Sequence, residues 1–78
     1  MITPEQSRAA RGLLDWSQTK LGQQAHLSES TIRDFERGRR VPSVNNLAAI
    51  ELALTSAGVV LLSAGDTSGG GPGVRLGD

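Results

Sequence analysis

Apolar residues recur at helical spacing along the first 57 positions of the chain. The longest series consists of Val44, Leu47, Ile50, Leu54 and Ala57, whose intervals of three and four residues place them on one face of a helix. Shorter predicted helices have inner faces made of Ala10, Leu13, Leu14, Ile32 and Phe35. Helices this short and this closely joined must pack across one another, so the pattern predicts a small helical core.

Serine, threonine and glycine residues mark the ends of these helices. Thr3 and Gln6 have the spacing of a capping box, in which each side chain bonds the backbone amide of the other. The other three predicted helices each follow a serine, and glycines follow the third and the fourth; these residues are Ser17, Ser28, Ser43, Gly38 and Gly58. The predicted helices therefore span about 4–14, 18–25, 29–37 and 44–57.

The composition changes after residue 58. The stretch VVLLS is apolar and β-prone, GDTSGGGPG is rich in glycine, and VRLG alternates apolar and polar residues. This order predicts two short strands joined by a loop. Because an isolated hairpin is marginal in water, we expect it to pack on the last helix and on the hairpin of a second copy of the chain. The residues expected in this dimer interface are Val59, Val60, Leu61, Leu62, Val74 and Leu76.

These patterns together predict a mainly α fold. Residues 1–58 form a four-helix domain, and residues 59–78 form a β-hairpin tail that serves as the dimerisation element. A chain of 78 residues buries only a modest fraction of its surface, so a homodimer is the expected source of additional stability.

The composition also excludes several classes of function. The absence of cysteine and the single histidine rule out a disulfide framework and argue against a metal site. Nothing resembles a nucleophile with a base and an orienting acid, so we expect no enzyme and no catalytic residues. The run SGGGPG lacks the Gly-Lys-Ser/Thr of a phosphate-binding loop, and no cofactor is expected. The longest apolar run, AGVVLLSA, is too short to cross a bilayer, and we expect a cytoplasmic protein without a membrane partner.

Charge is unevenly distributed along the chain. The formal net charge is zero, yet four of the eight basic residues lie within or just after the helix predicted over 29–37; they are Arg33, Arg37, Arg39 and Arg40. This helix follows the helix over 18–25 after a short turn, which is the arrangement of a helix-turn-helix unit whose second helix enters the major groove. Because the position of charge matters more than its total, the sequence indicates double-stranded DNA as a partner.

Residues 5–57 resemble the Cro/C1-type (Xre-like) helix-turn-helix family of small transcriptional regulators. The central stretch WSQTKLGQQAHLSESTIRDFERGRRVPS is similar to the family pattern S-Q-x-x-L-A-x-x-x-G-[VL]-S-x-x-T-I-x-x-[WIF]-E-x-G. The resemblance implies a four-helix, lambda-repressor-like DNA-binding domain. Gly22 stands where the family more often has alanine, and either residue is expected to be small enough for close helix contact. His26 stands at a turn position of positive φ that glycine usually fills, at an expected cost of ~1 kcal/mol.

The resemblance and the helix-turn-helix geometry assign roles to particular residues. The side chains expected to contact bases are Glu29, Ser30, Arg33 and Asp34. Contacts to phosphates are expected from Gln18, Ser28, Thr31, Arg37, Arg39 and Arg40. Arg11 and Glu36 occupy positions that commonly form a partly buried structural ion pair. The alternative for Arg33 and Asp34 is an ordinary surface ion pair, with Glu29 as the partner of Arg33.

We therefore expect a repressor or autoregulator that binds a palindromic operator as a homodimer. Such a dimer sets two recognition helices about one DNA turn, ~34 Å, apart. An interaction module is the alternative, either an antitoxin or an adaptor whose tail binds a toxin or a co-regulator. A helix-turn-helix that is used only structurally is a third possibility.

Overall fold

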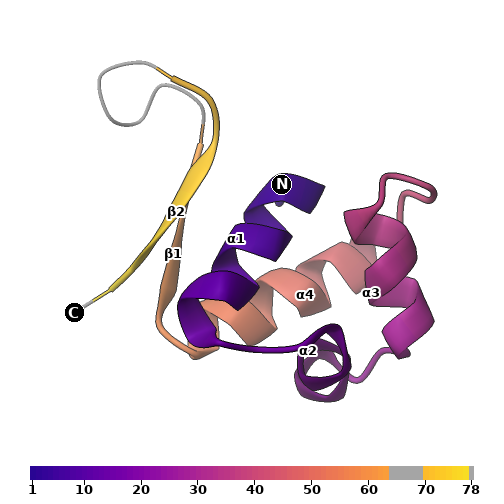
Figure 1. The fold of residues 1–78 in the computed structure, drawn as a ribbon. Coiled ribbons are helices and arrows are strands. Elements are labelled where there is room, and N and C mark those ends of the chain that lie inside the picture. The colour runs from indigo at the N-terminus through magenta and orange to yellow at the C-terminus, as the bar shows by residue number, and fades with distance from the viewer. Residues whose placement is uncertain (64–69, 78) are drawn as a thin grey trace.

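The computed structural model describes residues 1–63 and 70–77 and, within them, four helices followed by two strands (Figure 1). The elements are α1 (Pro4–Leu14), α2 (Gln18–Ala25), α3 (Glu29–Glu36), α4 (Val44–Ser56), β1 (Val59–Leu62) and β2 (Gly73–Leu76). The predicted mainly α fold with a C-terminal hairpin is confirmed. Two helix ends come one residue earlier than expected, because Arg37 and Ala57 serve as C-caps. The predicted glycine-rich loop, residues 65–73, lies partly outside the described residues.

All four predicted N-caps are confirmed. In the capping box of α1, the Gln6 amide donates to Thr3 Oγ1 at 3.1 Å and the Thr3 amide donates to Gln6 Oε1 at 2.9 Å. The hydroxyls of the three capping serines each accept from the backbone amide three residues later, and these pairs are Ser17 with Lys20, Ser28 with Thr31, and Ser43 with Asn46. The helix starts are therefore fixed by local sequence.

Left-handed residues turn the chain between helices. His26 ends α2 with φ 58°, as the sequence predicts, and Gly38 follows α3 with φ 73°. Asp15 ends α1 with φ 56°, a turn that the sequence did not predict. Aspartate tolerates this region better than most residues because its short polar side chain can bond locally.

The core lies where the helices cross. Its buried apolar residues are Ile2, Ala10, Leu21, Ala25, Ile32, Phe35, Leu47, Ile50, Leu54 and Val59. Trp16, two residues before α2, packs against this cluster.

Two residues expected in the core are exposed. Leu13 is 42% exposed because the inner side of α1 carries Gln6, Ser7 and Ala10, which turns Leu13 outward. Val44 is 69% exposed in the first turn of α4, where the buried side begins only at Leu47. The expected helical stripes were therefore wrong at their edges.

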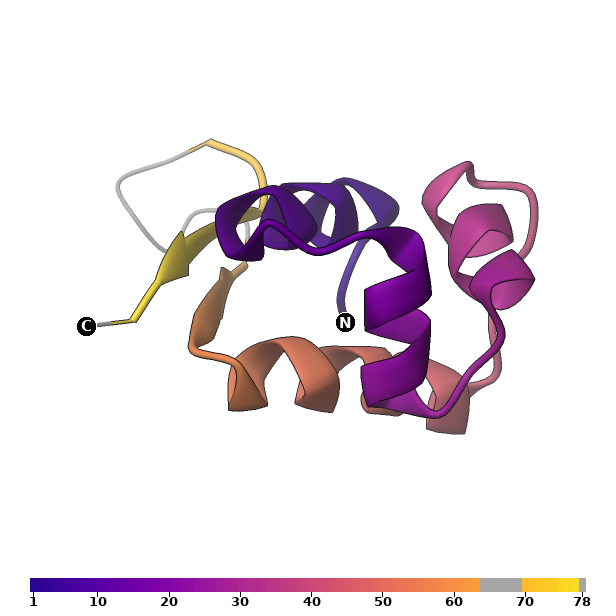
Figure 2. The same cartoon turned by 60° about the horizontal axis from the view of Figure 1, so that its bottom comes forward.

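The hairpin is antiparallel, with Val59 opposite Leu76 and Leu61 opposite Val74. Val59 belongs to the core, and Leu61 and Val74 pack against it. Since side chains alternate along a strand, Val60 lies on the opposite, outer face. Figures 1 and 2 show the hairpin at one end of the molecule, beside α1, and α3 at the other end.

Gln6 joins the hairpin to α1. Its Nε2 donates to Leu62 O at 2.9 Å and to Gly73 O at 3.0 Å, while its Oε1 serves the capping box. The side chain is buried, and both its amide oxygen and its amide nitrogen have hydrogen-bond partners. Gln6 thus fixes the start of α1 and also holds the end of β1 beside the start of β2.

Candidate nucleic-acid interface

Helices α2 and α3 approach each other closely at Gly22. A Cβ built on Gly22 would lie 2.7 Å from the backbone oxygen of Leu27, in the turn that leads to α3. The Leu27 amide also donates to Gly22 O at 2.8 Å, so the turn cannot move away without losing this bond. The expectation that alanine fits equally well is therefore wrong for this chain. Glycine here allows the tight contact that sets the angle between α2 and α3.

The inner side of α3 is firmly held and its outer side is open. Ile32 and Phe35 are 0% and 4% exposed. On the opposite side Glu29 and Ser30 are exposed, and the side chain of Arg33 is 38% exposed. Asp34 is half-buried. Four predicted base-contacting residues thus lie on a rigid helix, with access to solvent.

Glu29 contacts two neighbours on this outer side. Thr19 Oγ1, from α2, donates to Glu29 Oε1. Arg33 Nη1 lies 3.8 Å from Glu29 Oε2, so the alternative ion pair is present in the isolated chain. The pair is solvent-exposed and longer than a hydrogen bond, and contacts of this kind contribute little to stability. Within residues 1–63 and 70–77, no basic side chain pairs with Asp34.

The six residues predicted to contact phosphates have different surroundings. Arg37, Arg39 and Arg40 are exposed and form no ion pair within the described part of the chain. Ser28 caps α3, and its hydroxyl also lies within hydrogen-bond distance of Thr31 Oγ1, at 2.8 Å. Gln18 lies half-buried, and its Nε2 donates inward to Glu36 Oε1 at 3.2 Å. Gln18 therefore differs from the solvent-facing group that the sequence suggested.

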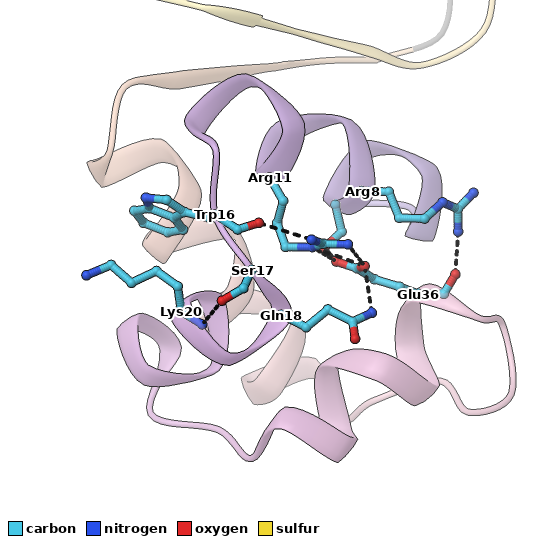
Figure 3. A network of polar contacts seen from close by, with 8 residues as sticks. Arg8, Arg11, Trp16, Ser17, Gln18, Lys20 and Glu36 are labelled. Carbon is cyan, nitrogen blue, oxygen red and sulfur yellow. Dashed lines mark hydrogen bonds and ion pairs between the residues drawn. The ribbon is translucent and has the colours of Figure 1, made fainter.

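Arg11 and Glu36 form the ion pair that joins α1 to α3 (Figure 3). Arg11 Nη2 lies 2.6 Å from Glu36 Oε1, and Arg11 Nε donates to Glu36 Oε2 at 2.9 Å. The side chains are 19% and 1% exposed, respectively. Arg11 Nη1 also donates to Trp16 O at 3.1 Å, which holds the loop before α2.

Sequence reasoning missed the other donors around Glu36. Ser7 Oγ donates to Glu36 Oε2 at 2.6 Å, and Arg8 Nη1 donates to the backbone oxygen of Glu36. Ser7 stands four residues before Arg11, so the two share a face of α1, and this spacing was the available signal. Gln18 completes the set from α2.

These donors keep Glu36 ionised. Burial raises the pKa of Glu36, but the hydrogen bonds from Arg11, Ser7 and Gln18, together with the positive charge of Arg11, outweigh burial and lower the pKa below its usual value. The carboxylate is thus neutralised inside the protein. Because Arg11 compensates the charge of Glu36, this carboxylate does not reduce the positive charge of the exposed arginines that follow α3.

Neither a metal site nor a membrane span is found in the described part of the chain. No group of three metal-binding side chains comes together in residues 1–63 and 70–77. No helix in those residues has the length and apolar character needed to cross a membrane.

Comparisons with known proteins match the helical part. A family model described as helix-turn-helix matches residues 8–56. The fold is similar to the DNA-binding domain of the P22 c2 repressor, residues 1–76, determined by nuclear magnetic resonance in solution. The two chains are 33% identical, the match covers 70% of this chain and 72% of that domain, and the TM-score is 0.64. No curated protein sequence matches the chain.

Proposed function

The chain belongs to the Cro/C1-type helix-turn-helix family of DNA-binding regulators, and on this basis we propose that it represses or autoregulates transcription as a homodimer on a two-fold related operator. The observation that carries the proposal is the open outer side of α3. Its polar side chains are exposed, while Ile32 and Phe35 fix the helix from within. A helix held in this way can enter the major groove without rearranging.

The side chains on α3 suit direct contact with bases. Arg33 can donate to guanine O6 and N7 together, and Glu29 can accept from the amino group of cytosine. Ser30 can contact several bases, and Asp34 is a further acceptor one turn along. Each well-formed contact of this kind discriminates between bases by ~1–3 kcal/mol.

Phosphates are bound by the groups around both ends of α3. Arg37, Arg39 and Arg40 supply exposed positive charge after the helix. The first amides of α2 and α3, with the hydroxyls of Ser28 and Thr31, supply neutral donors at helix N-termini, where the helix dipole favours anions. Gln18 Nε2 donates one N–H to Glu36, and its second N–H is the group that contacts phosphate. Because counterions are released, affinity falls steeply as salt rises.

The hairpin supports the homodimer through a smaller surface than the sequence suggested. Val59 is 3% exposed within its own chain, and Leu61 and Val74 pack against the core while remaining half-buried, so these side chains offer less surface to a second copy. Val60 and Leu62 are also half-buried but lie outside the core cluster, and Leu76 is 51% exposed. We therefore propose a dimer interface centred on Val60 and Leu62, on the outer face of two hairpins; Leu76, which pairs with Val59, lies at the edge of the opposite face. Val60→Lys is expected to yield monomers in analytical ultracentrifugation, whereas a change at Leu61 would disturb the core.

The test is selection of bound duplexes from a random library, followed by a salt titration on the best site. The proposal predicts an enriched two-fold related sequence and a linear fall of log affinity with log salt. Failure of the selection to enrich any sequence would overturn the proposal.

The spacing between the two half-sites tests the arrangement of the dimer, because the hairpin and α3 lie at opposite ends of a molecule of 35 × 26 × 19 Å. Half-sites more than one turn, ~34 Å, apart fit an end-to-end dimer through the hairpins, and a one-turn spacing fits contact nearer α3.

A further inference from the structure

We propose that Thr19 is a positioning residue for base recognition, because it holds the carboxylate of Glu29 at the start of α3. By this route α2 contributes to sequence specificity without touching a base. The inference rests on the proposed function, and it places a determinant of base specificity on α2, the helix that stays outside the major groove.

The contacts of Glu29 come from two sides. Thr19, the second residue of α2, donates its hydroxyl to Oε1, and Arg33, one turn further along α3, lies 3.8 Å from Oε2. Each carboxylate oxygen therefore has one neighbour of positive or hydrogen-bond-donating character. A glutamate side chain with both oxygens engaged samples fewer orientations than a free one, and this restriction lowers the entropy lost on binding.

The carboxylate keeps the capacity to accept from a base. Two carboxylate oxygens offer about four acceptor positions; the Thr19 hydroxyl occupies one, and Arg33, at 3.8 Å, lies beyond hydrogen-bond distance. The Glu29 side chain is 50% exposed on the open side of α3. A group that only accepts hydrogen bonds favours a base that presents an amino group in the major groove, which is cytosine N4 or adenine N6. It disfavours guanine and the O4 edge of thymine, which present acceptors there.

Arg33 has the complementary preference. Only Nη1 of its guanidinium approaches Glu29, and the remaining N–H groups are available for guanine. Holding Glu29 therefore also limits where Arg33 rests. The expected result is a half-site in which one base pair depends on Glu29 and, through it, on the hydroxyl of Thr19.

A purely structural role for this hydroxyl predicts that its loss changes the free energy of unfolding and weakens binding to all sequences alike. Thr19 is exposed, and an exposed hydrogen bond adds little to the free energy of unfolding. Base discrimination at one position, measured apart from overall affinity, therefore separates positioning from folding.

The experiment uses the full chain, the best selected duplex and all its single-base-pair variants, with binding measured by fluorescence anisotropy at one salt concentration. Glu29→Ala identifies the base pair that Glu29 reads. Thr19→Val removes the hydroxyl at nearly constant volume, and Thr19→Ser restores it. Thr55→Val is the matched control, because Thr55 is an exposed threonine on α4 whose hydroxyl bonds only its own helix, at Glu51 O and Leu52 O.

Wild-type protein is expected to discriminate at the Glu29-dependent pair by about 5- to 150-fold. Thr19→Val should reduce that discrimination by about 2- to 10-fold, at that pair only, with an unchanged salt slope and melting temperature. Thr19→Ser and Thr55→Val should match the wild type.

Three results would overturn the inference. The first is an unchanged specificity profile for Thr19→Val. The second is a uniform loss of affinity with a shallower salt slope, which would make Thr19 a backbone contact. The third is a Glu29→Ala profile identical to that of the wild type. A wild-type protein without sequence preference overturns the proposed function itself and the inference with it, so the two failures are distinguishable.

Discussion

Replacing Arg11 by methionine is the change that tests the buried ion pair most directly. Methionine keeps an unbranched side chain on α1 but removes every hydrogen bond from Arg11 to Glu36, and also the bond to Trp16 O. Ser7 and Gln18 still donate to the carboxylate. Glu36, with a side chain 1% exposed, would then carry an uncompensated charge in the core.

The expected loss is large for a domain of this size. Breaking one partner of a buried pair costs about 3–5 kcal/mol. A chain of 78 residues has a total stability of about 4–12 kcal/mol, from about 0.05–0.15 kcal/mol per residue. We therefore expect Arg11→Met to lose about a quarter or more of the free energy of unfolding. Urea denaturation followed by circular dichroism at pH 7 measures this loss.

The pH dependence gives a sign that packing effects alone would not produce. In the wild type, folding lowers the pKa of Glu36. The contribution of Glu36 to the free energy of unfolding is therefore complete above its unfolded pKa of about 4.3, and it is lost as the pH falls through the lower folded pKa. In Arg11→Met only the bonds from Ser7 and Gln18 oppose burial, so we expect the folded pKa of Glu36 to rise above its wild-type value. As the pH falls from 7 towards 4, the variant should then lose less stability through Glu36 than the wild type does.

The double variant Arg11→Met/Glu36→Gln is the control for loss of packing. It removes the buried charge and should be more stable at pH 7 than Arg11→Met alone. A loss below about 1 kcal/mol for Arg11→Met, or a pH trend equal to that of the wild type, would refute the assignment of Glu36 as a buried carboxylate held by Arg11.

Three further changes test local features of the fold. Gly22→Ala should lower the urea midpoint, because a clash costing about 1–3 kcal/mol with the Leu27 carbonyl outweighs a helix-propensity gain of about 1 kcal/mol; an unchanged midpoint would contradict the close contact. His26→Gly should raise the melting temperature, since glycine removes about 1 kcal/mol of left-handed strain; a lower melting temperature would contradict this. Gln6→Glu keeps the capping acceptor but loses both donations to the hairpin, so hairpin amides should exchange faster, at a cost of about 1–3 kcal/mol; unchanged protection would count against it.

Local sequence was sufficient to predict much of the fold. A capping residue acts on amides two or three positions away, so Thr3, Ser17, Ser28 and Ser43 marked the helix starts correctly. Side-chain direction at the edges of the core was not predictable in this way. Leu13 is exposed because Gln6 and Ser7 face inward to meet the hairpin and Glu36, which are partners distant in sequence.

The candidate interface was predictable to a lesser extent. Family resemblance brought together Arg11 and Glu36, which lie 25 residues apart and which helical periodicity alone does not join. The inward contact of Gln18 and the contact of Thr19 with Glu29 depend on the angle between α2 and α3, which no local pattern specifies. Likewise, the apolar run that begins at Val59 does not reveal which of its residues face the chain's own core.

Nuclear magnetic resonance can show residue by residue whether α3 meets DNA with its open side. The isotope-labelled protein is titrated with the selected duplex while backbone amide shifts are followed. We expect the largest changes in residues 28–40 and at the start of α2, with small changes in β1 and β2. Changes concentrated in the hairpin or in α4, with α3 unaffected, would contradict it.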